Sequence, residues 1–229
     1  LECSGRFDLW AAFRLRKYLT ENKINVLHTH NYKADVIGAL AARMGGIPIV
    51  ATAHGFTDMT ASVSFYEKLD RLFLRMFFDR VVTVTDKMLP ALTPRRKRVI
   101  PNGINTDFFN TNIETRDAFR RKYNIREDDM LVGTIGRLSK EKDQIMFLEA
   151  LEPLMRDEAR LKIIIVGSGP KEMELKEFVT AKGLSDRVVF TGIIKDVGPV
   201  YMALDVFVLS SLTEGVPLTV LEAMASGLP

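Results

Sequence analysis

The sequence has little cysteine and no long hydrophobic run, and both absences restrict the kind of protein it can be. Cys3 is the only cysteine among 229 residues, so no disulfide can form within the chain, and we expect a reducing, cytoplasmic compartment. No apolar run approaches the ~20 residues that a membrane-spanning helix needs. The formal net charge of +3 is too small to indicate nucleic-acid binding. A composition of 47% hydrophobic and 27% charged residues is typical of a globular protein with a substantial core.

Histidine is also scarce, which bears on metal binding. His28, His30 and His54 are the only histidines, and each lies near the end of an expected strand. No cysteine or carboxylate stands at a matching spacing, so we expect no metal site. We expect His28 to be buried and hydrogen-bonded, whereas His54, followed by Gly55, is the better candidate for a group that faces a ligand.

Short apolar runs alternate with helical patterns along the whole chain. Strands are expected at 24–27, 47–53, 81–84, 131–135, 161–166, 188–191 and 206–209, with helices between them. The segment 106–129 is polar and charged, with one expected helix at 116–123, and it is the best candidate for a domain boundary. The pattern predicts an α/β protein with two doubly wound parallel-sheet domains, 1–110 and 111–229, facing each other. In such sheets ligands bind outside the carboxyl ends of the strands.

The segment from Gly136 to Lys142 follows the first expected strand of the second domain and carries positive charge. The spacing from Ser139 predicts that Lys142 lies in the first turn of the next helix. A cation there is disfavoured by the helix dipole unless an anion is also bound. Arg137 can bind two oxygens at once, and Lys142 acts as a point charge, so a polyanion suits the pair. An ordinary solvated basic loop is the alternative.

A second loop, from Val166 to Pro170, contains Gly167 and Gly169. Two glycines after a strand could let the backbone approach a phosphate. The loop lacks the third glycine of the dinucleotide-binding fingerprint. A tight structural turn is therefore the favoured interpretation.

The last twenty residues read as loop and helix, with one carboxylate in each. Pro217 is expected in the first turn of this helix, and Gly227 is expected to end it. Glu214 lies in the loop and Glu222 within the helix. The unpaired N–H groups of a helix N-terminus suit phosphate oxygens, and carboxylates accept hydrogen bonds from hydroxyls. This stretch indicates a ligand with both phosphates and hydroxyls.

Basic residues at 95–98, together with arginines of a helix expected at 63–78, form a further candidate surface. Such residues suit an anionic membrane surface. Solvated surface charge is the more common interpretation.

Taken together, these segments resemble the retaining GT-B glycosyltransferases of family 4. The resemblance rests on the following segments: His28-Thr29-His30, Thr52-Ala53-His54-Gly55, Val99-Ile100-Pro101-Asn102-Gly103, Gly136-Arg137-Leu138 with Glu141-Lys142, Val166-Gly167-Ser168-Gly169-Pro170, Phe190-Thr191-Gly192, Glu214-Gly215 and Leu221-Glu222-Ala223-Met224-Ala225. The two glutamates show the family's E-x7-E spacing, and the resemblance covers nearly the whole chain.

The resemblance implies a GT-B fold, with two Rossmann-like domains facing a cleft, and transfer of a sugar from a nucleotide-sugar donor without metal or other cofactor. The acceptor would be a glycan or lipid-linked molecule in surface polysaccharide or glycolipid synthesis, at the inner face of the membrane if the protein associates with it. Arg137 and Lys142 would bind the donor diphosphate, and His54 the donor sugar. Glu222 would bind the ribose. The resemblance thus implies Arg137, Lys142, Glu214 and His54 as the catalytic residues. The remaining implied donor contacts are Gly136, Gly167, Gly192, Ile193, Gly215, Val216, Pro217 and Leu218.

Two differences from the family pattern leave alternatives open. Neither the family's opening strand and Gly-rich loop nor its continuation past Gly227-Leu228-Pro229 is found here. We therefore expect an internal fragment in which both domains are incomplete, and which is poorly active alone. A nucleotide-sugar epimerase of the same fold and a non-catalytic relative that binds sugar nucleotides are the alternative functions.

Overall fold

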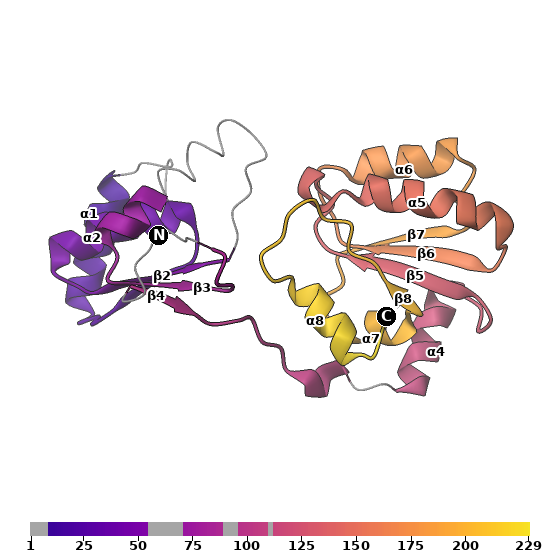
Figure 1. Ribbon diagram of the computed structural model, residues 1–229, viewed down its shortest axis with the longest axis horizontal. Coiled ribbons are helices and arrows are strands. Elements are labelled where there is room, and N and C mark those ends of the chain that lie inside the picture. Colours follow the sequence, from indigo (N-terminus) through magenta and orange to yellow (C-terminus); the bar gives the residue numbers. More distant parts are fainter. Residues whose placement is uncertain (1–8, 55–70, 89–95, 110–111) are drawn as a thin grey trace. The chain divides into compact units, whose positions relative to one another are not determined.

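The chain folds into two compact α/β units. The computed structural model describes residues 9–54, 71–88, 96–109 and 112–229. One unit comprises Leu1–Asn102 with Glu214–Val216, and the other comprises Gly103–Thr213 with Pro217–Pro229 (Figure 1). The domain boundary predicted between residues 110 and 111 falls outside the described residues and stays a prediction.

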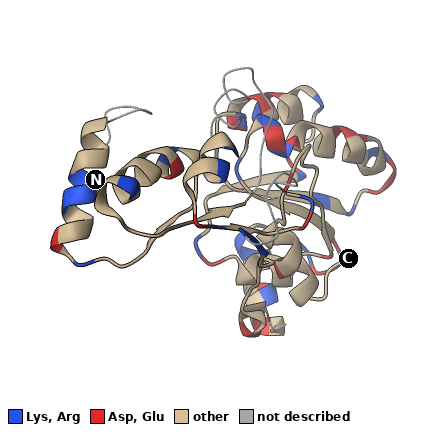
Figure 2. Cartoon of the chain, turned by 60° about the vertical axis from the view of Figure 1, so that its left-hand side comes forward, with Lys and Arg blue, Asp and Glu red and all other residues tan. Residues whose placement is uncertain are grey.

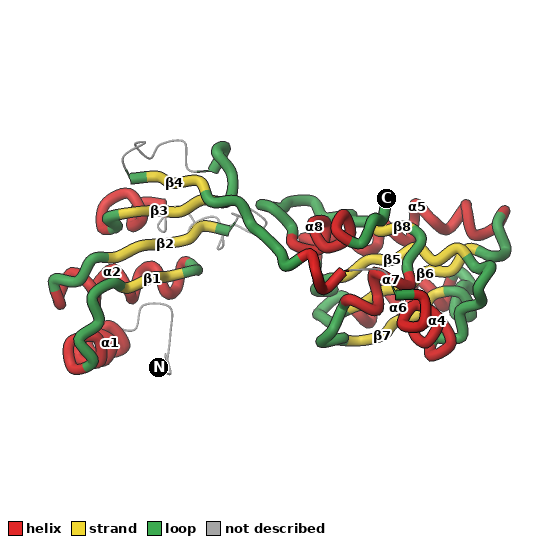
Figure 3. Tube along the Cα trace, turned by 90° about the horizontal axis from the view of Figure 1, so that it is seen from below, coloured by secondary structure: helices red, strands yellow, loops and turns green. Residues whose placement is uncertain are grey.

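The first unit is built on a parallel sheet with the strand order β1-β2-β3-β4 (Figure 3). Its strands are β1 (Leu27–Thr29), β2 (Ile49–Ala53), β3 (Arg80–Thr83) and β4 (Lys97–Val99), and its helices include α1 (Leu9–Glu21) and α2 (Tyr32–Gly45). Residues 71–77 are also helical, as predicted for part of the helix at 63–78, and residues 63–70 lie outside the described part. The core between helices and sheet contains Ile49, Leu74, Phe78 and Val81.

Helix α2 has clear sequence signals at both ends. The side chain of Asn31 accepts a hydrogen bond from the Ala34 N–H and caps the N-terminus. Gly46 ends the helix in the left-handed conformation, with φ of 66°, which glycine adopts without steric cost. These caps fix where α2 begins and ends between β1 and β2.

Strand β4 was not among the predicted strands. Its three residues pair in parallel with β3, from Val81↔Lys97 to Thr83↔Val99. Charge obscured the pattern, because this strand at the edge of the described sheet reads Lys-Arg-Val and has little apolar alternation. Part of the run considered for membrane contact is therefore a sheet edge.

The second unit contains a parallel sheet with the strand order β7-β6-β5-β8. Its strands are β5 (Met130–Ile135), β6 (Leu161–Val166), β7 (Val188–Gly192) and β8 (Val206–Phe207). Its α-helices are α4 (Ile113–Lys122), α5 (Gln144–Asp157), α6 (Glu172–Ala181), α7 (Gly198–Ala203) and α8 (Leu218–Ala225), with short 3-10 turns at η1 (Thr106–Phe109) and η2 (Lys140–Lys142). In chain order the strands are arranged 3-2-1-4, as in dinucleotide-binding α/β folds.

Helices cover both faces of this second sheet, which confirms the doubly wound prediction. On one face, Ile163 and Ile165 pack with residues of α5 and α6 such as Leu148 and Leu175. On the other, Ile164 packs with residues of α4, α7 and α8. Figure 1 shows α5 and α6 above the sheet and the other helices below it. Figure 2 shows acidic and basic residues interspersed along the helices of this unit.

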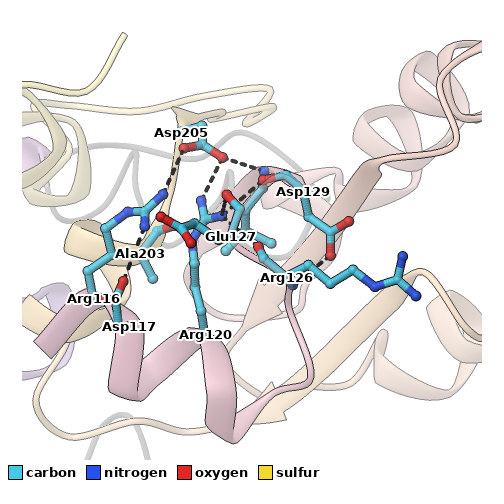
Figure 4. A network of polar contacts seen from close by, with 9 residues as sticks. Arg116, Asp117, Arg120, Arg126, Glu127, Asp129, Ala203 and Asp205 are labelled. Carbon is cyan, nitrogen blue, oxygen red and sulfur yellow. Dashed lines mark hydrogen bonds and ion pairs between the residues drawn. The ribbon is translucent and has the colours of Figure 1, made fainter. Parts of the chain in front are cut away.

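A buried arginine fixes α4 against the start of the sheet (Figure 4). The guanidinium of Arg120 donates to the carboxylate of Asp205 at 2.7 Å and to the carbonyls of Ala203, Arg126, Glu127 and Asp129. The same carboxylate oxygen of Asp205 accepts from the Leu131 N–H at 2.7 Å. Because Leu131 is the second residue of the strand β5, this network ties α4 and the loop that follows it to the sheet. It lies at the amino ends of β5 and β8, opposite the edge where a ligand is expected.

Candidate functional site

The loops that follow β5 and β8 meet at the carboxyl edge of the second sheet. These two strands are neighbours in the sheet, and connections leave them toward opposite faces, since α5 follows β5 on one face while α8 follows β8 on the other. Ser210 Oγ donates to the Lys142 carbonyl at 2.8 Å, and the Leu212 N–H donates to the Glu141 carbonyl at 2.9 Å. Doubly wound sheets bind their ligands at such a switch point.

The basic loop 136–142 is held in place by contacts to its backbone. The amide of Gln144, which is 3% exposed, donates to the Arg137 carbonyl at 2.9 Å. The Leu138 N–H donates to the Ser168 carbonyl at 3.0 Å. Arg137 itself is exposed. The loop therefore has a fixed path, while its arginine can reach a ligand.

Lys142 lies in a helical turn after Ser139, as predicted, but this turn is a separate 3-10 turn and not the first turn of α5. Lys142 ends the 3-10 turn η2, and α5 begins only at Gln144. Asp143, between them, has a left-handed backbone with φ of 45°, and it reorients the chain. The Lys142 side chain runs back along the loop, so that its Cε lies 3.9 Å from where a Cβ on Gly136 would stand. Lys142 thus remains beside Gly136 and Arg137 by a different route.

The positive charge of this loop affects the pKa of the Glu141 carboxyl group. Burial raises its pKa, but the neighbouring Ser139 hydroxyl, the local backbone and the charges of Arg137 and Lys142 together lower it below its ordinary value. Glu141 is therefore ionised near neutral pH. Its negative charge offsets part of the positive charge of Arg137 and Lys142 when no ligand is bound.

The glycines after β6 allow two loops to pass at close range, a contact that the sequence did not predict. A Cβ on Gly167 would stand 1.9 Å from the Gly136 carbonyl oxygen, and one on Gly169 would stand 2.3 Å from that of Leu138. Gly167 also has a φ of 134°, which side chains disfavour. Its N–H donates to the Gly192 carbonyl at 2.9 Å. Gly136, Gly167 and Gly192 are thus linked in series along the sheet edge.

Helix α8 begins one residue later than predicted. Pro217 precedes its first turn, with an extended backbone (φ −70°, ψ 123°), and Leu218 is the first helical residue. Gly227 follows the helix with φ of 73°, as predicted for a residue that ends it. Glu222 is half-buried on this helix, and its Oε2 accepts a hydrogen bond from the Tyr201 hydroxyl at 2.7 Å. Tyr201 was missed in the sequence because an aromatic residue in an apolar segment predicts core packing.

The three histidines form a cluster in the first unit, near the carboxyl ends of β1 and β2. His30 Nδ1 lies 3.1 Å from His54 Nε2, and the His28 and His30 rings are 4.3 Å apart. His28 Nε2 lies 2.8 Å from Thr52 Oγ1. The predicted hydrogen bonding of His28 is confirmed. The predicted burial of His28 is wrong, because His28 is exposed. Partial desolvation and then the charges of His30 and His54 lower the pKa of His28.

No metal site is evident in the part of the chain that the structure describes. It contains no group of three or more histidine, cysteine, aspartate or glutamate residues arranged to hold an ion. Likewise, among these residues no helix is both long and apolar enough to cross a bilayer. Within the basic run, Arg96 donates to the Arg75 carbonyl and Lys97 to those of Asp86 and Met88. These two side chains contribute to local structure.

The structure brings together only part of the predicted set. Backbone contacts join Gly136, Arg137, Lys142, Gly167 and Gly192 at one sheet edge. Ile193 follows β7 and is 75% exposed. Pro217, Leu218 and Glu222 belong to the same unit, whereas His54 and Glu214–Val216 belong to the first.

Comparison with protein families shows to which family the chain belongs. Residues 1–108 match the model described as Glycosyltransferase Family 4, and residues 129–229 match that described as Glycosyl transferases group 1. The chain belongs to the family 4, or group 1, glycosyltransferases. Its fold is therefore the GT-B fold that the sequence predicted.

Curated members of this glycosyltransferase family share about three residues in ten with the chain. It is 31% identical to the UDP-Gal:alpha-D-GlcNAc-diphosphoundecaprenol alpha-1,3-galactosyltransferase of Escherichia coli, over 97% of the chain and 61% of that protein. It is 29% identical to the alpha-monoglucosyldiacylglycerol synthase of Streptococcus pneumoniae, over 90% of the chain and 51% of that protein. The chain thus spans between half and two thirds of the length of these relatives.

Solved structures of this glycosyltransferase fold agree. The crystal structure of HepE from Anabaena in complex with UDP-glucose superimposes with a TM-score of 0.84 at 21% identity, covering 95% of the chain and 61% of HepE. This similarity concerns the fold. Both parallel sheets of the chain therefore have counterparts in a solved structure of the same fold.

Proposed function

We propose that this glycosyltransferase moves a sugar from a nucleotide-sugar donor to a glycan or lipid-linked acceptor, with retention of the anomeric configuration. The observation that carries the proposal is the basic loop with Arg137 and Lys142, fixed by backbone contacts at the switch point of the second sheet. The names of relatives support the substrate class, because one uses UDP-galactose and a diphosphoundecaprenol acceptor and another makes a glycosyldiacylglycerol.

In this proposal Arg137 and Lys142 bind the donor diphosphate. During transfer, the bond from the anomeric carbon to the diphosphate oxygen breaks, a bond to the acceptor oxygen forms, and the proton of the acceptor hydroxyl passes to a phosphate oxygen of the departing diphosphate. Negative charge therefore develops on the departing nucleoside diphosphate. An arginine and a lysine fixed beside it stabilise that charge more in the transition state than in the ground state. They supply electrostatic stabilisation without a metal.

The remaining residues bind the other parts of the donor. Glu222 accepts hydrogen bonds from the ribose hydroxyls, and Gly192 with Ile193 lies beside the base. The backbone from Gly215 to Leu218 faces the phosphates, and Glu214 faces the donor sugar. His54 also hydrogen-bonds the donor sugar. Each role follows from the match to the family pattern, and each is part of the proposal.

We propose that the reaction belongs to surface polysaccharide or glycolipid synthesis and takes place at the cytoplasmic face of the membrane. A lipid-linked acceptor is itself anchored in a bilayer, so the enzyme must meet it at that surface. Peripheral association is part of the proposal, and a sedimentation assay with vesicles that contain anionic lipid tests it.

A transfer assay separates this proposal from its alternatives. The purified protein is incubated with UDP-, GDP- and ADP-sugars, with and without diphosphoundecaprenol-linked sugar or diacylglycerol acceptors, and products are analysed by mass spectrometry and NMR. We expect an acceptor-dependent product with the anomeric configuration of the donor. Conversion of the donor without acceptor would favour an epimerase. Nucleotide binding without turnover on any acceptor would favour a non-catalytic relative.

A further inference from the structure

The hydrogen bond between Tyr201 and Glu222 joins a core residue to the helix that carries the proposed ribose contact. The Tyr201 hydroxyl donates to Glu222 Oε2 at 2.7 Å, and the Thr219 carbonyl oxygen lies 3.2 Å from the same hydroxyl. Within the described part of the chain, no group donates to the other carboxylate oxygen, Oε1. One oxygen of Glu222 is thus held by the protein, and the other can accept from a ligand.

Packing fixes the Tyr201 ring, and the ring in turn fixes the direction of this hydrogen bond. Tyr201 is fully buried. Its ring centroid lies 5.7 Å from that of Phe109 in an edge-to-face arrangement and 5.8 Å from that of Phe207. Aromatic neighbours at such distances restrict the ring on both sides. The hydroxyl therefore remains at one position relative to α8.

The protonation of Tyr201 makes it a permanent donor. Burial raises the pKa of its hydroxyl, and so do the hydrogen bond to Glu222 and the negative charge of that carboxylate. The hydroxyl therefore stays protonated at every pH at which the protein is folded. Tyr201 can thus always donate its hydrogen bond to Glu222. A neutral donor to an ionised acceptor is among the stronger hydrogen bonds.

We propose that Tyr201 is a positioning residue that orients the Glu222 carboxylate toward the 2′ and 3′ hydroxyls of a nucleoside diphosphate. The inference rests on the proposed function, because it requires a nucleotide donor at this site. With Oε2 held, Glu222 does not have to lose side-chain rotational freedom when the ligand binds. Tyr201 would thereby contribute to the preference for ribose hydroxyls without touching the ligand.

The test compares nucleotides with and without these hydroxyls. Calorimetry on the purified full-length protein first identifies which of UDP, GDP and ADP binds, and then measures that nucleotide and its 2′,3′-dideoxy analogue. We expect the wild-type protein to prefer the ribonucleotide by about tenfold or more, as a charged hydrogen bond implies. The preference should fall severalfold in Tyr201→Phe, while affinity for the dideoxy analogue stays nearly unchanged. Tyr123→Phe, which removes a hydroxyl that makes no hydrogen bond to any described residue, should keep the preference.

Further variants keep the inference falsifiable. Glu222→Gln should lose the preference, and adding Tyr201→Phe to it should change nothing more. If Tyr201→Phe does not fold, Glu222→Asp replaces it in the test. The shorter aspartate side chain cannot reach the Tyr201 hydroxyl, and we expect the same loss of preference for the ribonucleotide. An unchanged preference, or equal weakening of both nucleotides, would overturn the positioning role. A wild-type protein that binds nucleotides without preferring ribose hydroxyls would also overturn it but leave the proposed function standing, whereas no nucleotide binding at all would overturn both.

Discussion

Ser210 donates a hydrogen bond from its side-chain hydroxyl to the backbone carbonyl of Lys142, across 2.8 Å. The bond joins the loop after β8 to the basic loop after β5. Ser210 is 7% exposed, so the bond is shielded from water. It is one of the contacts that keep Lys142 at the edge of the sheet where strand order reverses.

Removing this hydroxyl should weaken nucleotide binding without removing a ligand contact. Ser210→Ala leaves the Lys142 carbonyl without its side-chain donor, and loss of such a hydrogen bond costs about 1 kcal/mol. We expect affinity for the nucleotide to fall about fivefold, measured by calorimetry. Ser211→Ala is the matched control, since the Ser211 hydroxyl is buried without a hydrogen bond to any described residue. Equal effects of the two substitutions would contradict the bracing role of Ser210.

The close passage of two loops at Gly167 should make this position intolerant of any side chain. Gly167→Ala adds a methyl group that would stand 1.9 Å from the Gly136 carbonyl oxygen. Gly183→Ala is the control, because Gly183 also has positive φ, at 68°, but no atom within 4 Å of a Cβ. We expect Gly183→Ala to cost roughly 1–2 kcal/mol of unfolding free energy, from backbone strain alone.

Gly167→Ala should cost clearly more than its control and should also displace Arg137. Urea denaturation measures the first effect, and nucleotide affinity of the folded fraction measures the second. Similar stabilities of the two variants would show that the loops can separate without penalty, contrary to the fixed path described above.

Arg120 should be one of the most important residues for stability in the second unit. Arg120→Met would leave buried carbonyls without their donor and would remove the ion pair with Asp205, whose carboxylate keeps its hydrogen bond from the Leu131 N–H. A buried acceptor that loses its donor costs about 1–3 kcal/mol, and Arg120 serves several such acceptors. Arg121→Met, at an exposed neighbouring position, should change stability by less than about 0.5 kcal/mol. Chemical denaturation checks both, and a loss below about 1 kcal/mol for Arg120→Met would refute the structural role assigned to the network.

The histidine cluster predicts a pH dependence with a definite sign. The folded protein lowers the pKa of His28 below its ordinary value of 6.5. The unfolded chain therefore binds more protons in this range, and the contribution to stability is present above pH 6.5 and diminishes as the pH falls. An NMR titration of the His28 ring should give a pKa below 6.5, and His30→Gln should move it back upward. A wild-type value at or above 6.5 would be inconsistent with the cluster.

Much of the fold was predictable because its signals are local. Apolar runs such as that of β6, from Leu161 to Val166, occur where a strand is covered on both faces, and they were found. Strand β4 was missed because an edge strand with Lys97 and Arg98 needs no apolar pattern. The apolar pattern of a strand is strong where helices cover both faces of the sheet. The pattern is weak in an edge strand, which has only one neighbouring strand.

The candidate site shows the same limit. The spacing of Ser139 and Lys142 predicted a helix start, but the left-handed backbone of Asp143 delays it, and that conformation has no strong signature in an aspartate. The partnership of Tyr201 with Glu222 joins α7 to α8 across 21 positions. No local pattern reveals such a pair. Residue types and strand ends were predictable, whereas the contacts that orient them came from the tertiary structure.

The central claim is that the basic loop after β5 binds the diphosphate of a nucleotide. Calorimetric titration of the preferred nucleoside diphosphate into wild-type protein, Lys142→Ala and Lys140→Ala tests it most directly. Lys140 lies in the same 3-10 turn and is exposed, so it controls for the change in net charge. We predict that Lys142→Ala weakens binding by roughly 1.5–3 kcal/mol, as for loss of a charged hydrogen bond, while Lys140→Ala changes it by less than about 0.5 kcal/mol. Equal affinities of wild-type protein and Lys142→Ala would contradict the account.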